Sequence, residues 1–172
     1  MRAAVLGAGA VGARVARQLL SGGLVDQVVL RDTDADRLAW VSRSLGERLI
    51  IEHAPFPASL EADVVVVATP GGTQLPAVVD ALAHQRPVIT TGDGLAETVA
   101  MLKLAPQAQE AGVSVVLGAG FAPGLSCVLA AHGAMWLDHV EEIHVAKAGT
   151  GGPVCASVHH RALSRIVYDS RH

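Results

Sequence analysis

The sequence predicts an α/β protein with a doubly wound, mostly parallel sheet of about six strands. Short apolar runs alternate along most of the chain with segments whose apolar residues recur every three or four positions. Hydrophobic residues make up 51% of the chain and charged residues only 17%, which is typical of strands buried on both faces. Because 172 residues are too few for two full domains, we expect one domain over residues 1–137 and a short remnant of a second over residues 138–172.

The first element is a strand over residues 3–6, followed by a glycine turn and a helix. The helix places Val11, Val15 and Leu19 one turn apart, as expected for a face packed on a sheet. Such a turn brings bare backbone N–H groups and the positive end of a helix dipole together, which suits a pyrophosphate. The residues expected to hold a dinucleotide here are Gly7, Ala8, Gly9, Ala10, Val11 and Gly12.

An acid follows the second strand, residues 28–30. Asp32 stands 20 positions after Gly12, where a carboxylate can accept hydrogen bonds from the adenosine ribose hydroxyls and repel a 2′-phosphate. Thr33 comes next and is expected to bind the cofactor together with Asp32. An NADP site would more usefully have a basic residue there, so NAD is the preferred cofactor and NADP the alternative. Arg31 could still hold a phosphate. Asp32 could instead be an N-terminal acid of a helix over residues 33–45, in which Thr33 and Asp36 have capping-box spacing.

The remaining elements continue the alternation and complete a Rossmann domain. Leu38, Val41 and Leu45 form the inner stripe of the second helix. Thr73 can cap a third helix that carries Val78, Val79 and Leu82. The further strands are expected over residues 49–51, 63–68, 87–91 and 113–117, with helices over residues 95–103 and 107–111.

Loops at the carboxyl ends of parallel strands line the ligand crevice of such a sheet. After the fourth strand, Ala68, Thr69 and Pro70 should therefore lie near the nicotinamide half of the cofactor, although the same residues could form an ordinary tight turn. After the sixth strand, the glycine-rich loop over residues 118–124 could hold a substrate anion.

The C-terminal part is expected to contain a helix over residues 125–135 and a strand over residues 140–147. We expect core positions in this helix, and we expect Ile143 and Val145 on one face of a strand of a different sheet. Cys127 and Cys155 match neither a redox pair nor a zinc spacing, and we expect small buried side chains. The helix positions assigned to the core are Leu125, Val128, Leu129 and Met135.

Charge and hydropathy exclude several function classes. Lys and Arg number 13 and Asp and Glu 16, so a net charge of -3 gives no broad basic field for nucleic acid or anionic lipid. The apolar runs are far shorter than the roughly 20 residues of a membrane span, and no secretory leader pattern is present. We expect a cytoplasmic protein with no metal site.

Several segments together resemble the NAD(P)-binding domain of the saccharopine dehydrogenase family, of the saccharopine reductase type. They are the GAGAVG turn, ATPGG at residues 68–72, VITTGD at residues 88–93, GAGFAPGLSCVLA from residue 118 and VAKAGTGGP from residue 145. The resemblance implies hydride transfer between the nicotinamide and an imine or secondary amine derived from an amino acid. It also implies a second domain that binds substrate and dimerises.

Candidate substrate and catalytic residues follow from this resemblance. Lys147 could hold a carboxylate or relay a proton, or it could be a surface lysine. The family's Asp-Pro-Gly is Ala122-Pro123-Gly124 here, and its Gly-Gly-Leu-Pro is Gly151-Gly152-Pro153, which weakens the transfer of saccharopine itself as substrate. The residues implied to bind substrate are Gly120, Phe121, Pro123, Gly124, Gly151 and Gly152.

Two functions remain open at this stage. The first is an NAD(P)-dependent oxidoreductase of saccharopine dehydrogenase type acting on a small amino-acid-like substrate. The alternative is a stand-alone NAD(P)-binding module without turnover. A homodimer is expected because a lone exposed strand at residues 140–147 invites pairing with a second copy.

Overall fold

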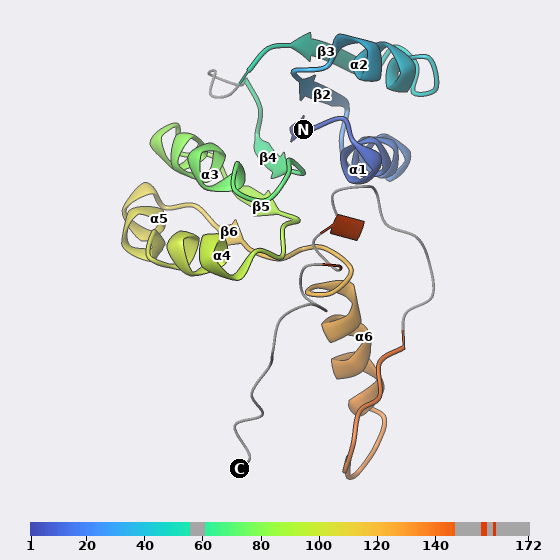
Figure 1. Cartoon of the computed structure of the whole chain (residues 1–172), viewed down its shortest axis with the longest axis vertical. Helices are drawn as coiled ribbons and strands as arrows, with labels where there is room; N and C mark the ends of the chain where they lie inside the picture. The colour runs from blue at the N-terminus through green and yellow to red at the C-terminus, as the bar shows by residue number, and fades with distance from the viewer. Residues whose placement is uncertain (56–60, 147–155, 158–159, 161–172) are drawn as a thin grey trace.

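The computed structural model describes residues 1–55, 61–146, 156–157 and 160. Its centre is a six-stranded parallel sheet in the order β3-β2-β1-β4-β5-β6. Figure 1 shows the sheet between the helices. The doubly wound α/β fold predicted from the sequence is therefore confirmed. The strands are β1 (Arg2–Leu6), β2 (Gln27–Asp32), β3 (Leu49–His53), β4 (Val64–Val67), β5 (Val88–Thr90) and β6 (Val115–Val116). The helices are α1 (Ala10–Ser21), α2 (Ala35–Ser42), α3 (Gln74–Ala83), α4 (Leu95–Leu102), α5 (Ala105–Ala111) and α6 (Leu125–Ala134).

The strand order reverses direction between β1 and β4. Val5 of β1 pairs with Leu30 of β2 on one side and with Val66 of β4 on the other, all in parallel register. The loop after β1 and the loop after β4 therefore leave the same edge of the sheet beside each other. In open α/β sheets this switch point is where ligands bind.

Two helical layers cover the sheet. One apolar core lies between β1, β2 and the helices α1 and α2, and includes Val28, Leu30, Leu38 and Val41. The other lies between β4, β5 and the helices on the opposite face, as the two sides of Figure 1 show. Strands enclosed in this way must be apolar on both faces, which explains the run of valines in β4.

The buried face of α1 differs from the predicted one by a single position. Gly12, Ala16 and Leu20 are the buried residues, whereas Val15 and Leu19 pack only at the margin of the core. Val11 is 42% exposed. Small residues on the inner face let α1 approach β1 closely, so the larger side chains flank the contact.

Two threonines predicted as helix caps make no capping hydrogen bond with their side chains. Asp34, not Thr33, is the N-cap of α2, and its side chain accepts a hydrogen bond from the Arg37 backbone N–H at 2.9 Å. Thr73 is the N-cap position of α3, but its hydroxyl donates to the Pro70 carbonyl instead of capping the helix. Both predictions relied on local spacing and missed a better-placed acceptor nearby.

The predicted C-terminal helix is present as α6, but its predicted burial and the strand expected after it are wrong. The predicted core residues of α6 are exposed, from 50% for Leu125 to 82% for Met135, because the helix leads away from the sheet (Figure 1). Residues 140–146 form no strand, and Ile143 and Val145 are also exposed. Cys127 is exposed rather than buried. In the described part of the chain, no helix combines the length and the apolar character needed to cross a membrane.

Candidate dinucleotide-binding site

Two glycines make the close approach of the turn to the sheet possible. Gly7 has a φ of +98°, and a Cβ on it would lie 2.7 Å from the Ala68 carbonyl oxygen at the end of β4. A Cβ on Gly12 would overlap the carbonyl oxygen of Gly7. Both positions therefore need glycine for packing alone.

Gly9 differs from these two glycines, because a side chain added to it would point into open space. A Cβ there would meet no atom within 4 Å, and the backbone is extended at φ -69° and ψ -171°. Gly9 is the N-cap of α1 and supplies no side-chain cap, and the first turn of the helix carries no acid. The fold of the turn therefore does not require glycine at this position.

The N-terminus of α1 is open for an anion. Within the described residues, no protein group accepts a hydrogen bond from the backbone N–H groups of Ala10, Val11 and Gly12. These are the unpaired donors that every helix N-terminus has, and they carry its positive partial charge. With Gly9 leaving the approach clear, the site fits a phosphate or pyrophosphate.

Asp32 lies beside this turn at the carboxyl end of β2. The side chain is buried, and Oδ2 accepts a hydrogen bond from the Ala8 N–H at 2.6 Å. Oδ1 accepts from the Asp34 N–H at 2.9 Å. Arg37 Nη1 also donates to Oδ1 and Oδ2, at 3.4 and 3.3 Å. Because an ionised carboxylate accepts about four hydrogen bonds, a ribose hydroxyl would have to displace this longer contact. Because Asp34 caps α2, Asp32 is not needed as the cap of that helix.

The neighbouring cations are arranged differently from the sequence expectation. Arg31 is 5% exposed, and its Nε donates to Glu52 Oε2 on β3 at 2.9 Å, so an ion pair within the sheet fixes this guanidinium. The half-exposed Arg37 instead lies 3.3 Å from Asp32 Oδ2 and 3.1 Å from Asp34 Oδ2. The sequence analysis missed Arg37, although its place in the first turn after an acidic strand end was a usable signal.

The loop after β4 lies against the glycine turn. The Ala68 N–H donates to the Leu6 carbonyl at 2.8 Å, and its carbonyl oxygen is the atom closest to Gly7. Thr69 follows with a buried hydroxyl oxygen that has no partner among the described residues. Buried polar atoms are nearly always paired, so a ligand amide or hydroxyl at this position would satisfy it. Pro70 and Thr33 are exposed at the rim.

The second glycine-rich loop lies at the same edge of the sheet. The Ala119 N–H donates to the Thr90 carbonyl at 2.7 Å, and the Gly118 N–H donates to the Thr90 hydroxyl at 3.3 Å. A Cβ on Gly120 would lie 3.1 Å from the Thr91 carbonyl oxygen. The loop, which follows β6 in the chain, therefore lies against the carboxyl end of β5. Phe121 and Pro123 are exposed and Gly124 precedes α6.

Three of the predicted residues, Lys147, Gly151 and Gly152, lie outside the described residues. In the described ranges, no group of three or more His, Cys, Asp or Glu side chains could hold a metal ion.

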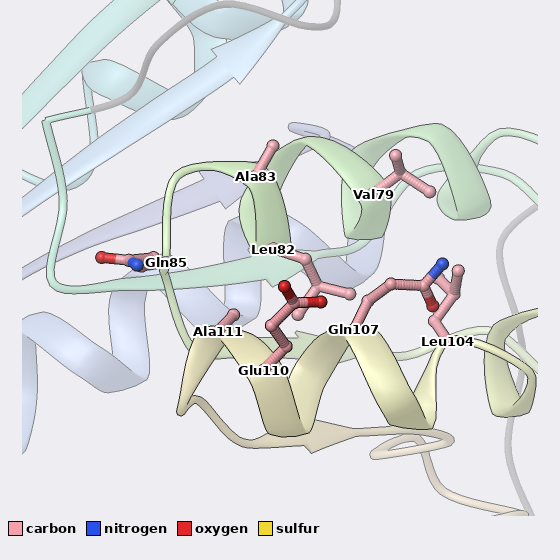
Figure 2. Close-up of a pocket in the computed structure, with 8 residues that line it drawn as sticks. All are labelled: Val79, Leu82, Ala83, Gln85, Leu104, Gln107, Glu110 and Ala111. Carbon is pink, nitrogen blue, oxygen red and sulfur yellow. The ribbon is translucent and has the colours of Figure 1, made fainter.

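A separate hollow of about 460 Å³ lies between α3 and α5, as Figure 2 shows. It adjoins the C-terminal half of α3, whereas the predicted crevice adjoins the N-terminus of that helix. No predicted site residue lines it. The lining residues are Val79, Leu82, Ala83, Gln85, Leu104, Gln107, Glu110 and Ala111.

Several solved structures share this fold. Saccharopine dehydrogenase (L-Glu forming) from Saccharomyces cerevisiae is similar with a TM-score of 0.61 and 18% identity, over 78% of this chain and 31% of that chain. GenD2 from gentamicin A biosynthesis, in complex with NAD, is similar with a TM-score of 0.58 and 25% identity, over 78% and 38%.

A variant of KijD10, a 3-ketoreductase from Actinomadura kijaniata in complex with TDP-benzene and NADP, is similar with a TM-score of 0.54 and 21% identity, over 66% and 36%. The chain thus spans about a third of the length of the solved structures it matches. At identities of 18% and 21%, the similarity to the yeast enzyme and to KijD10 shows a shared fold and nothing more specific.

A comparison with family models places the chain more specifically. The model described as "Ketopantoate reductase PanE/ApbA" matches residues 3–142, which include the glycine turn, Asp32 and all of the sheet except Arg2. The saccharopine dehydrogenase resemblance is thus supported at the level of the fold and not as the specific family. The fold is the Rossmann type of NAD(P)-dependent oxidoreductases, and the chain belongs to the ketopantoate reductase PanE/ApbA family.

Proposed function

We propose that this chain binds a nicotinamide dinucleotide and forms the cofactor-binding part of an NAD(P)-dependent oxidoreductase. The observation that carries the proposal is the open N-terminus of α1 beside the buried carboxylate of Asp32. The N–H groups of Ala10, Val11 and Gly12 would hold the pyrophosphate, and Asp32 would accept from the adenosine ribose. The bound cofactor supplies the hydride.

The nicotinamide half would then reach the loop after β4. Ala68 directly adjoins the glycine turn, and Thr69 in the same loop has a buried hydroxyl with no hydrogen-bond partner among the described residues. Thr69 would orient the ring by hydrogen bonding, and the backbone of residues 68–70 would exclude water from one side of it. This arrangement follows the general rule for the switch point of such sheets.

We propose NAD as the preferred cofactor, with NADP as the alternative. Asp32 at the end of β2 favours two free ribose hydroxyls and repels a 2′-phosphate. Arg31 is held by Glu52, which removes the cation that the sequence suggested for a phosphate. Arg37 is the cation that could hold the 2′-phosphate of NADP. To do so it would have to break its ion pairs with Asp32 and Asp34.

We propose that the substrate is a small carboxylate with a carbonyl or imine carbon that accepts the hydride. The family is named after ketopantoate reductase, which favours ketopantoate as a substrate to test. The resemblance to saccharopine dehydrogenases instead implies an imine or secondary amine derived from an amino acid. The loop that carries Gly120, Phe121, Pro123 and Gly124 would contact the substrate, together with Lys147, Gly151 and Gly152. Lys147 is the candidate for holding a carboxylate or relaying a proton.

We further propose that residues 1–137 are the cofactor domain and that residues 138–172 begin a substrate and dimerisation domain. The support is the exposed apolar surface that starts with α6 and includes Val128, Leu129, Met135 and Ile143. Apolar side chains exposed together over one segment are typical of a surface that is covered in the assembled protein. The proposed occupant is a second copy, in a homodimer.

Calorimetric titration of the chain with NADH and with NADPH tests the binding step. We expect saturable binding at one site per chain with a lower Kd for NADH, and the absence of binding by either cofactor would refute the proposal. Oxidation of NADH is then followed with ketopantoate, and separately with a mixture of an amino acid and a 2-oxo acid. Binding without turnover on either substrate class would favour the stand-alone module.

A further inference from the structure

A buried carboxamide connects two loops at the carboxyl edge of the sheet. Gln74, the first residue of α3, is 1% exposed. Its Nε2 donates to the Thr69 carbonyl at 2.8 Å, and its Oε1 accepts from the Gly92 N–H at 3.2 Å. The side chain therefore joins the loop after β4 to the loop after β5. Since a buried amide is costly without partners, its position is strongly specified.

The fit around this carboxamide is tight. A Cβ on Gly92 would lie 2.6 Å from Gln74 Oε1 and 2.7 Å from Nε2. The loop after β5 can therefore approach the carboxamide only because residue 92 is glycine. The two loops are held together by complementary shape as well as by hydrogen bonds.

A carboxylate from a third element fixes the same region. Glu97 in the first turn of α4 accepts from the Gly72 N–H at 2.7 Å through Oε2. Its Oε1 accepts from the N–H groups of Gln74 and Leu75 at 2.7 and 2.9 Å. One side chain thus satisfies three donors at and before the N-terminus of α3, where its negative charge also matches the helix dipole.

This arrangement contrasts with that of α1 at the same edge of the sheet. The N-terminus of α1 is open, whereas the N-terminus of α3 is filled by Glu97. An anion can therefore bind at α1 but would meet a carboxylate at α3. The two segments therefore differ. The N-terminus of α1 is open to a ligand, whereas the loop after β4 is held in one conformation by protein contacts.

We propose that Gln74 and Glu97 are positioning residues that fix the loops after β4 and β5 as one wall for the nicotinamide half of the cofactor. The inference rests on the proposed function and adds residues that touch no cofactor themselves. Gln74 acts through the Thr69 backbone, and Glu97 acts through the backbone of Gly72, Gln74 and Leu75. The adenosine half, at α1 and Asp32, does not depend on them.

The test compares two ligands that share the adenosine half. Affinities for NADH and for ADP-ribose are measured by calorimetry on the wild-type chain and on Gln74→Met, which keeps the side-chain length but removes both hydrogen bonds. We expect Gln74→Met to lower the affinity for NADH about tenfold and to change the affinity for ADP-ribose less than about twofold. We also expect a smaller rise in NADH fluorescence on binding, because the nicotinamide is less firmly held.

Two further variants keep the test valid if Gln74→Met folds poorly. Glu97→Gln removes the charge at α3, and Gly92→Ala pushes against the carboxamide without altering it. Both should show the same split between the two ligands. Gln107→Met, at an exposed glutamine of α5, is the matched control and should behave as wild type.

The outcomes separate the two levels of the proposal. Equal weakening of NADH and ADP-ribose in the variants, or no weakening of either, would overturn the positioning role while leaving dinucleotide binding intact. Failure of the wild-type chain to bind ADP-ribose would overturn the proposed function, and the positioning role with it.

Discussion

Replacing Gly9 with aspartate should strengthen the fold and abolish dinucleotide binding at the same time. Gly9 is the N-cap of α1, its backbone is extended, and a Cβ added to it would have no atom within 4 Å. Aspartate is among the best N-cap residues, and its carboxylate would accept from the N–H groups of Val11 or Gly12. The same carboxylate would then occupy the place proposed for the pyrophosphate.

The two effects have different magnitudes. Better capping and the favourable interaction with the helix dipole should together raise the free energy of unfolding by about 0.5–1 kcal/mol. For a chain of this size, that corresponds to a rise in Tm of about 1–4 °C. Two unit charges about 4 Å apart interact by about 4 kcal/mol at an effective dielectric constant of about 20. A loss of NADH affinity of at least about 100-fold is therefore expected.

The assay pairs thermal unfolding, followed by circular dichroism, with calorimetric titration of NADH. Gly9→Asn is the matched control, because asparagine caps about as well as aspartate but carries no charge. It should raise Tm by less, because only the capping contribution remains, and it should weaken NADH binding less. If Gly9→Asp is more stable and still binds NADH like the wild type, the pyrophosphate does not bind at α1. If Gly9→Asp is less stable, the description of this helix terminus is wrong.

Three other predictions follow from the same contacts. Gly12→Ala should lower Tm by several degrees, since its Cβ would overlap the Gly7 carbonyl oxygen and about 1–3 kcal/mol of strain is expected; an unchanged Tm in thermal unfolding would contradict the packing of the turn. Asp32→Ala should reduce the preference for NADH over NADPH about tenfold in calorimetry, because the repulsion of a 2′-phosphate is lost, and an unchanged ratio would mean that Asp32 does not contact the ribose. A hydrogen bond with the Gly124 backbone, and a weaker one with Ser126, lower the pKa of the Cys127 thiol. Because the thiolate is the reactive form, alkylation of this cysteine by iodoacetamide should reach its plateau at a lower pH than that of an ordinary thiol, as peptide mapping would show; an ordinary titration would contradict these contacts.

The first half of the fold was predictable because its signals are local. A glycine turn between an apolar strand and an amphipathic helix, with Asp32 at the end of the next strand, specifies its own geometry. The same reasoning placed the loop after the fourth strand at the carboxyl edge of the sheet, since strand order in a doubly wound sheet follows general topological rules. The site residues supplied by this part of the chain lie together, as expected.

The parts that could not be predicted depend on contacts between distant segments. Glu97 caps α3 from 23 positions away, and the Gln74 side chain bonds to Gly92, 18 positions further along the chain. No spacing rule identifies such partners. Local spacing also predicted Thr33 and Thr73 as caps. It did not show that Asp34 and Glu97 would accept the N-terminal N–H groups of α2 and α3 instead.

The helix α6 shows the limit of composition as a guide. Its apolar residues predicted a core position, yet Leu125, Val128 and Leu129 are at least half exposed. Apolar periodicity indicates that a face is to be covered, and does not show which surface covers it. For this reason the sequence predicted the helix and not its environment.

The most direct test of the central claim observes the backbone amides of the glycine turn during ligand binding. In ¹⁵N-edited NMR spectra of the chain titrated with ADP-ribose, we predict the largest saturable shifts at the amides of Gly9, Ala10 and Val11. The amides of Gly72 and Leu75, which Glu97 already occupies, should change little. Shifts centred on the N-terminus of α3, or no saturable shift at the turn, would contradict the account.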